Sequence, residues 1–417
     1  MTRHALIVEP YLSGGLLPSA LRRQGVTPIG LHLRPLTHKI AETFRAREYA
    51  DHFVYPGNIG RLRARLRNFN IVAVFAGQEA GVELADRLCA AFEVPANNPV
   101  LSSARRDKFL MHQRLTEQGL RAIRQTRAAD SAALIAWIET ENCWPAVIKP
   151  VNSGGTDGVR YCWTPRDVIE AHSESIGRTN LLGFPNFDLL AQELIEGTEY
   201  IVDAVSCGGR HEVVNIARYH KEVTDNGSPI YRTIDFIDPV QWPAYGEVVK
   251  YILSVLDALG ICVGPSHSEV FIDSDGPVLV ETGARLCGAM VPQYLDEISN
   301  NSILDLVVAS AIAPARFEAL TTKPRMYTQR LRAVVLRTRL SGVVKGRPGE
   351  VMVRQLRSFR DVIWFAVPGA PIVPTRDLMT ALGIVFLQSP DDSTLDADVD
   401  ELRRFEDEEL LVDVMGF

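Results

Sequence analysis

Two glutamates at matching positions of a short hairpin are the residues in this sequence best suited to chemistry. The segment from Ser268 to Glu281 contains two apolar strands around an Asp-Gly turn at 274–276, a pattern that predicts an antiparallel hairpin. With the turn centred there, Glu269 and Glu281 fall opposite each other on one face. Like charges directly opposite destabilise a sheet, so the pattern indicates a cation between them. Hard oxygen ligands favour Mg²⁺ or Mn²⁺.

Arg285 follows a Thr-Gly-Ala turn directly after Glu281. A guanidinium there would lie beside the metal and could clamp a transferring phosphoryl group or a developing oxyanion. The competing interpretation is a two-stranded edge with solvated glutamates. The apolar residues around both acids count against it, and we favour the metal site.

A second group is suited to holding phosphate. Lys149 ends one predicted strand, and a loop rich in Gly, Ser and Thr leads at once to the next strand; its candidate residues are Ser153, Gly154, Gly155, Thr156 and Gly158. Glycines let backbone N–H groups approach an anion, and a lysine can sit on phosphate oxygens. The sequence contains neither G-x-x-x-x-G-K-[ST] nor G-x-G-x-x-G opening a helix. The segment resembles a lid over phosphates, with an ordinary hairpin as the alternative.

A third group fits the rest of a nucleotide. A strand enters a short turn and leaves as a strand with an acidic first residue, over Gln192, Glu193, Leu194, Ile195 and Glu199. Backbone groups beside an apolar slot could hold an adenine edge, and the Glu199 carboxylate could accept ribose hydroxyl protons. Taken alone, a surface turn rich in glutamate is the more common explanation.

The elements that must position these residues change along the chain. Residues 4–100 alternate apolar strands (4–9, 26–33, 71–75) with helices, which predicts a parallel sheet covered on both faces. Helices at 105–118 and 132–139 and the Lys149 hairpin follow. From about 185, strands dominate, with helices at 245–259 and 303–313. After Pro324 we expect a β-rich tail with strands at 331–340, 349–356 and 362–367, and a solvated helix and edge at 391–409.

Composition limits the choice of partners and compartment. The chain has 417 residues, 46% hydrophobic and 23% charged, and a net charge of -7. This is the mix of an ordinary globular protein of several packed units. The absence of a basic, aromatic-rich stripe argues against nucleic acid, and no stretch reaches the roughly 20 apolar residues of a membrane span. Six scattered cysteines without zinc spacing favour reduced thiols in the cytoplasm.

The order of these groups resembles the ATP-grasp superfamily and, within it, the L-amino acid ligases. The series runs from Arg105-Arg-Asp-Lys108 through the Lys149 loop and the glutamate-rich turn to the Glu269, Glu281 and Arg285 group. Gly77-Gln-Glu-Ala-Gly81 and Glu281-Thr-Gly-Ala-Arg285-Leu-Cys-Gly288 resemble the same ligases. The resemblance covers roughly residues 4–315, and the tail after 324 fits their small C-terminal domain.

This resemblance implies a multidomain α/β and α+β protein with the ATP-grasp fold. We expect an N-terminal parallel-sheet domain (1–100), linker helices and an ATP lid domain (101–185), an antiparallel-sheet catalytic domain (186–323) and a small β-rich C-terminal domain (324–417). Dimers are common among such ligases, so a monomer and a homodimer both remain open.

The resemblance also implies roles. Lys108 and Lys149 bind ATP phosphates, Ser153 to Gly158 form the mobile lid, Glu193 to Ile195 offer backbone to adenine, and Glu199 binds ribose. Glu269 and Glu281 hold Mg²⁺, and Arg285 stabilises the phosphorylated intermediate. One position departs from the pattern: many ATP-grasp enzymes have Asn where this chain has Gly283, so a second Mg²⁺ would be held less fully or differently.

The implied reaction is ATP-dependent joining of a carboxylic acid to an amine through an acyl phosphate, with release of ADP and phosphate, in the manner of a dipeptide synthetase of antibiotic biosynthesis. The substrates are small amino-acid or carboxylic-acid molecules. His267 is the candidate base, and the substrate contacts are predicted at Glu79, Arg218, His220, Tyr231, Arg232, Arg285 and Gly288. The alternatives are a carboxylase or purine-pathway ligase and a non-catalytic nucleotide-binding module.

Overall fold

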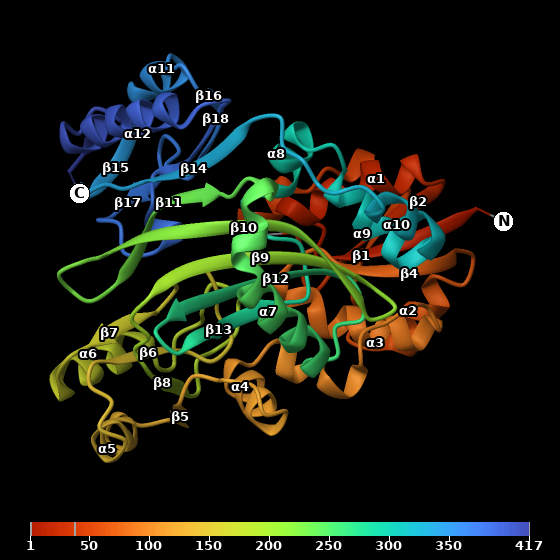
Figure 1. Cartoon of the computed structure of the whole chain (residues 1–417), viewed down its shortest axis with the longest axis horizontal. Coiled ribbons are helices and arrows are strands. Elements are labelled where there is room, and N and C mark those ends of the chain that lie inside the picture. The colour runs from red at the N-terminus through yellow and green to blue at the C-terminus, as the bar shows by residue number, and fades with distance from the viewer. Residues whose placement is uncertain (1, 37–38, 417) are drawn as a thin grey trace. The chain divides into compact units, whose positions relative to one another are not determined.

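The computed structural model describes residues 2–36 and 39–416, and the chain divides into two compact units (Figure 1). Unit 1 comprises Met1–Ala122, Ile201–Ile216 and Pro239–Tyr327. Unit 2 comprises Ile123–Tyr200, Ala217–Asp238 and Thr328–Phe417. None of the helices in the described residues combines the length and apolar character that a bilayer crossing requires.

Unit 1 begins with the predicted parallel sheet, whose strand order is β3-β2-β1-β4. Its elements are β1 (Arg3–Val8), α1 (Leu17–Arg23), β2 (Val26–His32), β3 (Asp51–Val54), α2 (Ile59–Arg65), β4 (Asn70–Ala76) and α3 (Val82–Phe92). Leu6 and Val8 pack with α2 and α3 in one apolar cluster. Figure 1 shows α1 and the later α9 (Ile303–Ile312) on the opposite side of the sheet. Helices therefore cover both faces of the parallel sheet, as the sequence predicts.

Unit 1 also contains an antiparallel portion that positions the glutamate hairpin. Its strands lie in the order β13-β12-β9-β10 and are β9 (Thr198–Cys207), β10 (Arg210–Val223), β12 (Val263–Asp273) and β13 (Gly276–Gly283). Residues 198–200 of β9 and 217–223 of β10 belong to unit 2. The helices are α4 (Lys108–Glu117), α7 (Gly246–Ala258), α8 (Val291–Ile298), α9 and α10 (Pro314–Thr321). Helix α7 is fixed to the hairpin because the Tyr251 hydroxyl accepts a hydrogen bond from Leu279 N at 3.0 Å.

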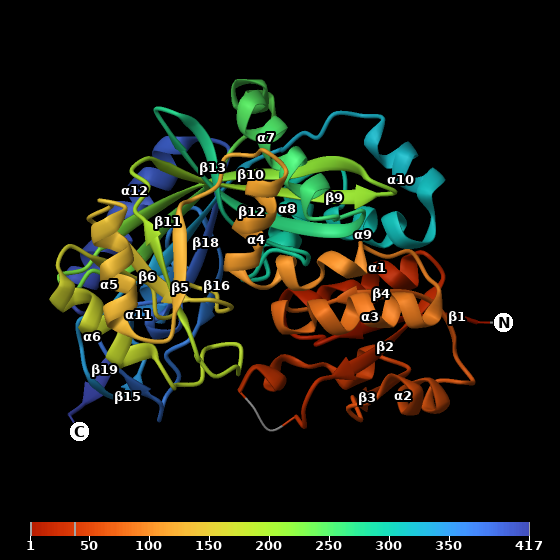
Figure 2. The ribbon, with the colours of Figure 1, turned by 90° about the horizontal axis from the view of Figure 1, so that it is seen from below.

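Unit 2 contains a four-stranded antiparallel sheet with the order β5-β8-β6-β7. Its elements are β5 (Gln125–Ala128), α5 (Ser131–Thr140), β6 (Ala146–Pro150), β7 (Arg160–Cys162), α6 (Pro165–Ser175) and β8 (Leu189–Glu193). Figure 2 shows α5 and α6 beside these strands, and their apolar side chains share one buried cluster with them. The pairing of β6 with β7 confirms the predicted hairpin after Lys149.

The remainder of unit 2 mixes strands and helices. Four of its strands are hydrogen-bonded neighbours in the order β11 (Pro229–Phe236), β14 (Arg330–Leu336), β18 (Gly383–Ser389) and β16 (Phe359–Trp364). A small sheet contains β17 (Pro371–Ile372), β15 (Gly342–Gly346) and β19 (Asp413–Met415), and two helices complete the unit, α11 (Gly349–Arg354) and α12 (Asp392–Asp407).

Two expectations for this tail were wrong. The strand predicted at 349–356 is helix α11, where Glu350 and Arg354 form an ion pair at helical spacing, 2.9 Å apart, and Val353 is buried. Helix α12 forms as predicted, but it is not simply solvated: Leu395, Leu402 and Phe405 lie in the apolar cluster of unit 2. The many acidic residues of this segment obscured a stripe of apolar residues that recurs every three to four positions and forms the buried face of the helix.

Replacement of Leu402 by alanine tests the packing of α12. Leu402 is fully buried, so Leu402→Ala is expected to lower the free energy of unfolding by about 2–5 kcal/mol. Asp400 is exposed on the same helix, and Asp400→Ala should change it by less than about 0.5 kcal/mol. Urea unfolding of both variants provides the measurement, and equal values would contradict a buried helix face.

Candidate active site

The β12–β13 hairpin places its two glutamates face to face. Glu269 pairs with Glu281 in the antiparallel register, and Asp273 pairs with Gly276 beside the turn. A register shift between Glu269 and Val270 marks a bulge at this point of the strand. The facing arrangement predicted from the sequence is confirmed, and bulges of this kind re-aim side chains next to functional sites.

A lysine neutralises one of the two acids. Lys108 Nζ lies 2.6 Å from Glu281 Oε2. Lys108 opens helix α4, whose N-cap Asp107 accepts a hydrogen bond from Leu110 N at 3.1 Å. The helix lies against the hairpin, where His112 Nε2 is 3.2 Å from Val280 O. The sequence order placed Lys108 upstream of the hairpin, and the fold brings it to the carboxylates.

A buried polar cluster adjoins the other acid. His267 Nδ1 is 2.6 Å from Asp203 Oδ1, and Nε2 is 3.7 Å from Glu269 Oε1. Asn215 donates a hydrogen bond to the second oxygen of Asp203 at 2.8 Å. Burial alone would lower the pKa of His267, but the Asp203 carboxylate outweighs burial and raises the pKa to about 9. The imidazolium is then the main form near neutral pH, which suits holding charge better than accepting a proton.

Sequence reasoning missed Asp203 and Cys287 as members of this cluster. The ligand atoms of Asp203, His267 and Cys287 all lie within 4.8 Å of one another. Burial is the largest cause that raises the pKa of the Cys287 thiol well above its ordinary value. One signal was available, because Asp203 is the only charged residue in the apolar run Ile201–Val205.

Arg285 belongs to an ion-pair chain that begins in the loop after β4. Its Nε lies 2.8 Å from Glu79 Oε2, while Arg106 Nη1 lies 2.6 Å from Glu79 Oε1. Burial alone would raise the pKa of Glu79, but the two guanidinium groups outweigh burial and hold the pKa below its usual range. Arg106 is another residue that the prediction missed, although it lies within the quoted Arg105–Lys108 motif.

The turn that carries Gly288 is anchored to the parallel-sheet portion of unit 1. Val291 N donates to Gly288 O at 3.2 Å, and Met290 N donates to Ser13 Oγ at 3.2 Å. Unit 1 thus brings together six predicted residues around the hairpin: Glu79, Lys108, His267, Glu269, Glu281 and Arg285.

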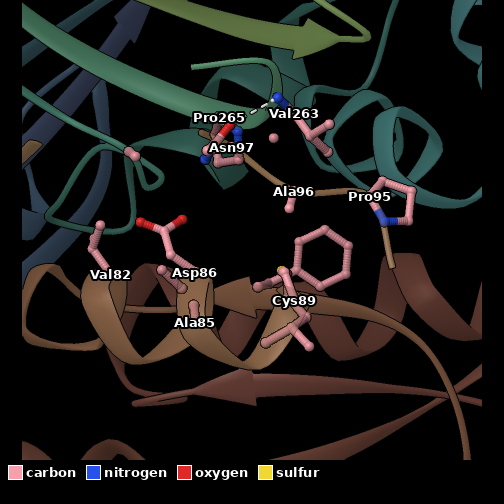
Figure 3. Close-up of a pocket in the computed structure, with 14 residues that line it drawn as sticks. Val82, Ala85, Asp86, Cys89, Pro95, Ala96, Asn97, Val263 and Pro265 are labelled. Atoms are coloured by element: carbon pink, nitrogen blue, oxygen red, sulfur yellow. Dashed lines mark hydrogen bonds between the residues drawn. The ribbon is translucent and has the colours of Figure 1, made fainter. Parts of the chain in front are cut away.

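A separate small pocket in unit 1 lies between α3 and the start of β12 (Figure 3). Asp86 rises from α3 into it, and Asn97 accepts a hydrogen bond from Val263 N at 2.9 Å. The Asp86 carboxylate is paired with Arg105 at 2.6 Å. None of the predicted site residues lines this pocket.

Unit 2 carries the predicted phosphate loop. Lys149 is buried on β6, and Ser153 Oγ donates to Asp157 Oδ2 at 2.6 Å. Gly155, Thr156 and Gly158 all have positive φ, of 64°, 61° and 69°. This left-handed conformation is unusual for Thr156 and turns successive peptide groups of the loop. The Thr156 hydroxyl is buried and makes no hydrogen bond to the described residues.

The glutamate-rich turn forms at the end of β8. Gln192 and Glu193 end the strand, and Leu194 and Ile195 follow it outside regular structure. Gln192 is buried and donates to Gln125 Oε1 at 2.8 Å. The buried Glu199 carboxylate lies 2.7 Å from Lys221 Nζ, which the sequence analysis did not include.

The other predicted substrate contacts also lie in unit 2. Arg218 and His220 both reach the Asp235 carboxylate, at 3.3 and 2.8 Å. Tyr231 faces Lys221, whose Nζ is 4.6 Å from the ring centroid. Arg232 pairs with the buried Glu406 at 2.9 Å, so its charge is already matched.

Comparison with known proteins identifies the family of the chain. Residues 143–293 match the model of the ATP-grasp domain. Dapdiamide A synthase from Enterobacter agglomerans is 30% identical over 362 residues, which cover 85% of this chain and 84% of that protein. The L-arginine-specific L-amino acid ligase from Bacillus subtilis is 25% identical over 161 residues, or 38% of each chain.

Solved structures extend the similarity in fold to the whole chain. The L-amino acid ligase from Bacillus licheniformis superposes with a TM-score of 0.78 at 18% identity, covering 100% of this chain and 99% of that one. Phosphoribosylglycinamide synthetase from Anaerococcus prevotii gives a TM-score of 0.65 at 13% identity, with all of both chains covered. With a relative at 30% identity over most of both lengths, the chain belongs to the ATP-grasp family of ligases, with the L-amino acid ligases among its relatives.

Proposed function

We propose that this chain joins two amino-acid-like substrates through an amide bond, with ATP converting the carboxylate of one into an acyl phosphate. The observation that carries the proposal is the cluster in unit 1, where facing Glu269 and Glu281 lie with Lys108 and Arg285. The dapdiamide A synthase relative supports a role in making a natural product.

The facing carboxylates fit a divalent cation. Glu269 is buried and Glu281 is half-buried, so two negative charges on paired strands need positive charge close by. Lys108 supplies part of it, and Mg²⁺ or Mn²⁺ held by both glutamates would supply the rest. When bound, such an ion neutralises phosphate charge and orients the triphosphate.

The nucleotide contacts of unit 2 complete the proposal. Lys149 and the loop Ser153–Gly158 bind phosphate oxygens, and the left-handed residues of the loop turn its successive peptide groups in a way that favours an anion. The backbone of Glu193 to Ile195 holds adenine, and Gln192 fixes this strand end through its bond to Gln125. Glu199 binds ribose, and its ion pair with Lys221 holds the carboxylate in place.

The chain's own residues then have defined tasks. A substrate carboxylate oxygen attacks the γ-phosphorus, the bond to the bridging oxygen breaks, and ADP leaves. The amine of the second substrate attacks the acyl carbon, phosphate leaves, and the amine loses a proton. Lys108 and Arg285 neutralise negative charge during these steps, and Lys149 binds phosphate oxygens. The glycine-rich loop excludes water that would hydrolyse the acyl phosphate.

The proposed substrate contacts differ in the exposure of their side chains. Arg218 and His220 are about two-fifths exposed and are the stronger candidates for substrate contact, whereas Arg232 is occupied by Glu406. Tyr231 and Gly288 complete the proposed set, together with Glu79, although both of its carboxylate oxygens are already paired with arginines. His267 is the proposed proton acceptor, acting from its neutral imidazole, which is the minor form near neutral pH. All six cysteines are free thiols, which supports a reducing cytoplasmic compartment, and a homodimer is the proposed assembly.

A product screen tests this function directly. The protein is incubated with ATP, Mg²⁺ and a pool of amino acids, and products are identified by mass spectrometry while ADP release is followed. We expect ADP formation that depends on amino acids and a product with the mass of two amino acids less one water. Bicarbonate-dependent or phosphoribosylamine-dependent turnover would favour a carboxylase or purine-pathway ligase, and nucleotide binding without turnover would favour a non-catalytic module.

Replacement of Glu281 tests the hairpin. Because Glu281→Ala removes half of the proposed metal site, kcat should fall at least about 100-fold, while the thermal unfolding midpoint stays within a few degrees. Glu247→Ala, on an exposed position of α7 in the same unit, is the matched control and should retain the wild-type rate. An unchanged rate in Glu281→Ala would remove the hairpin from the mechanism.

A further inference from the structure

The glycine at position 283 has no backbone reason to be glycine. Gly283 is the last residue of β13, and its φ lies outside the left-handed region. What excludes a side chain is space, because a Cβ at this position would collide with Glu79 Oε2 and lie 3.4 Å from Arg285 Cζ. The space that a side chain at position 283 would fill is thus taken by a carboxylate from the loop after β4.

That loop is built to hold Glu79 in place. A Cβ on Gly77 would overlap Glu9 O, and one on Gly81 would lie 2.9 Å from Val8 O. Between them, Gln78 Nε2 donates to Tyr11 O at 2.7 Å. Close backbone approach at both ends and a side-chain bond in the middle pin the loop to the end of β1. The backbone that carries the Glu79 side chain is therefore held in place.

The two carboxylate oxygens of Glu79 form ion pairs with two different arginines. Oε1 lies 2.6 Å from Arg106 Nη1, and Oε2 lies 2.8 Å from Arg285 Nε. Arg285 Nη1 also donates to Leu286 O at 3.1 Å. Two of the three nitrogens of the Arg285 guanidinium are thereby fixed, and within the described residues Nη2 has no hydrogen-bond partner. Held at both Nε and Nη1, the planar guanidinium has one orientation, which fixes where Nη2 lies.

We propose that Glu79, held by Arg106, is a positioning residue that aims Arg285 at the phosphorylated carboxylate, and that residue 283 is glycine to make room for it. This inference rests on the role of Arg285 in the proposed function. It gives Glu79 a task other than direct substrate contact, and it gives a steric reason for the glycine at position 283.

A double-mutant cycle tests the link between Glu79 and Gly283. Gly283→Ala, Glu79→Ala and the double variant are compared by kcat for ADP release with the best substrate pair from the product screen. Gly283→Ala should lower kcat at least about tenfold alone, but less than about twofold in the Glu79→Ala background, where the colliding oxygens are gone. Gly246→Ala, with open space around its Cβ and no positive φ, should leave kcat unchanged.

The same cycle is measured on thermal unfolding without substrates. Gly283→Ala should lower Tm in the wild-type background and not in the Glu79→Ala background. Equal losses in both backgrounds, in kcat or in Tm, would overturn the proposal. A wild-type protein without amino-acid-dependent turnover would contradict the proposed function instead, and the unfolding cycle would still decide whether Glu79 dictates Gly283.

An isosteric variant separates positioning from substrate contact. Glu79→Gln keeps the shape but removes the charge that holds Arg285, so kcat should fall about tenfold with KM for ATP and for the amino acids within about twofold. A raised amino-acid KM with unchanged kcat would make Glu79 a substrate contact and overturn the positioning role. Unchanged kcat and KM would equally overturn it.

Discussion

Two carboxylates face each other on paired strands of unit 1, and the residues around them must supply compensating positive charge. Glu269 and Glu281 occupy partner positions of β12 and β13, where like charges repel and burial raises the cost. Three basic side chains supply positive charge. Lys108 pairs with Glu281, His267 lies beside Glu269, and Arg285 interacts electrostatically with both glutamates. A sheet that only needed stability would carry apolar or oppositely charged residues here. Facing carboxylates surrounded by basic side chains fit a proposed site for a divalent cation and a polyphosphate.

The supporting groups around this cluster are drawn from segments distant in sequence. Lys108 comes from the first residue of α4, Asp203 from the middle of β9 and Glu79 from the loop after β4. Each supporting group is fixed by its own partner: Asp107 caps α4, Asn215 holds Asp203, and Arg106 holds Glu79. At the proposed site, the parallel sheet positions the loop that carries Glu79, and the antiparallel sheet sets the register that brings Glu269 opposite Glu281. The cluster therefore depends on the packing of several elements rather than on one local motif.

The sequence predicted what is local and periodic. The hairpin register follows from an Asp-Gly turn between two apolar strands, and the parallel sheet follows from alternating strands and helices, so both could be found before the structure. Residues 349–356 were misassigned because Val351 and Val353 look like a strand, while the Glu350–Arg354 ion pair and burial of Val353 favour a helix. The pairings of Glu79 with Arg106, His267 with Asp203 and Glu199 with Lys221 join residues 22 to 64 positions apart. Such contacts depend on tertiary packing, which no local pattern encodes.

The central claim is that Glu269 and Glu281 share one divalent ion when nucleotide is bound. Anomalous diffraction from Mn²⁺, in crystals grown with a non-hydrolysable ATP analogue, tests it most directly. The account predicts a peak about 2.0–2.3 Å from a carboxylate oxygen of each glutamate and within the same distance of phosphate oxygens. A manganese ion bound elsewhere, with Glu281 still paired to Lys108 and Glu269 still facing His267, would contradict it.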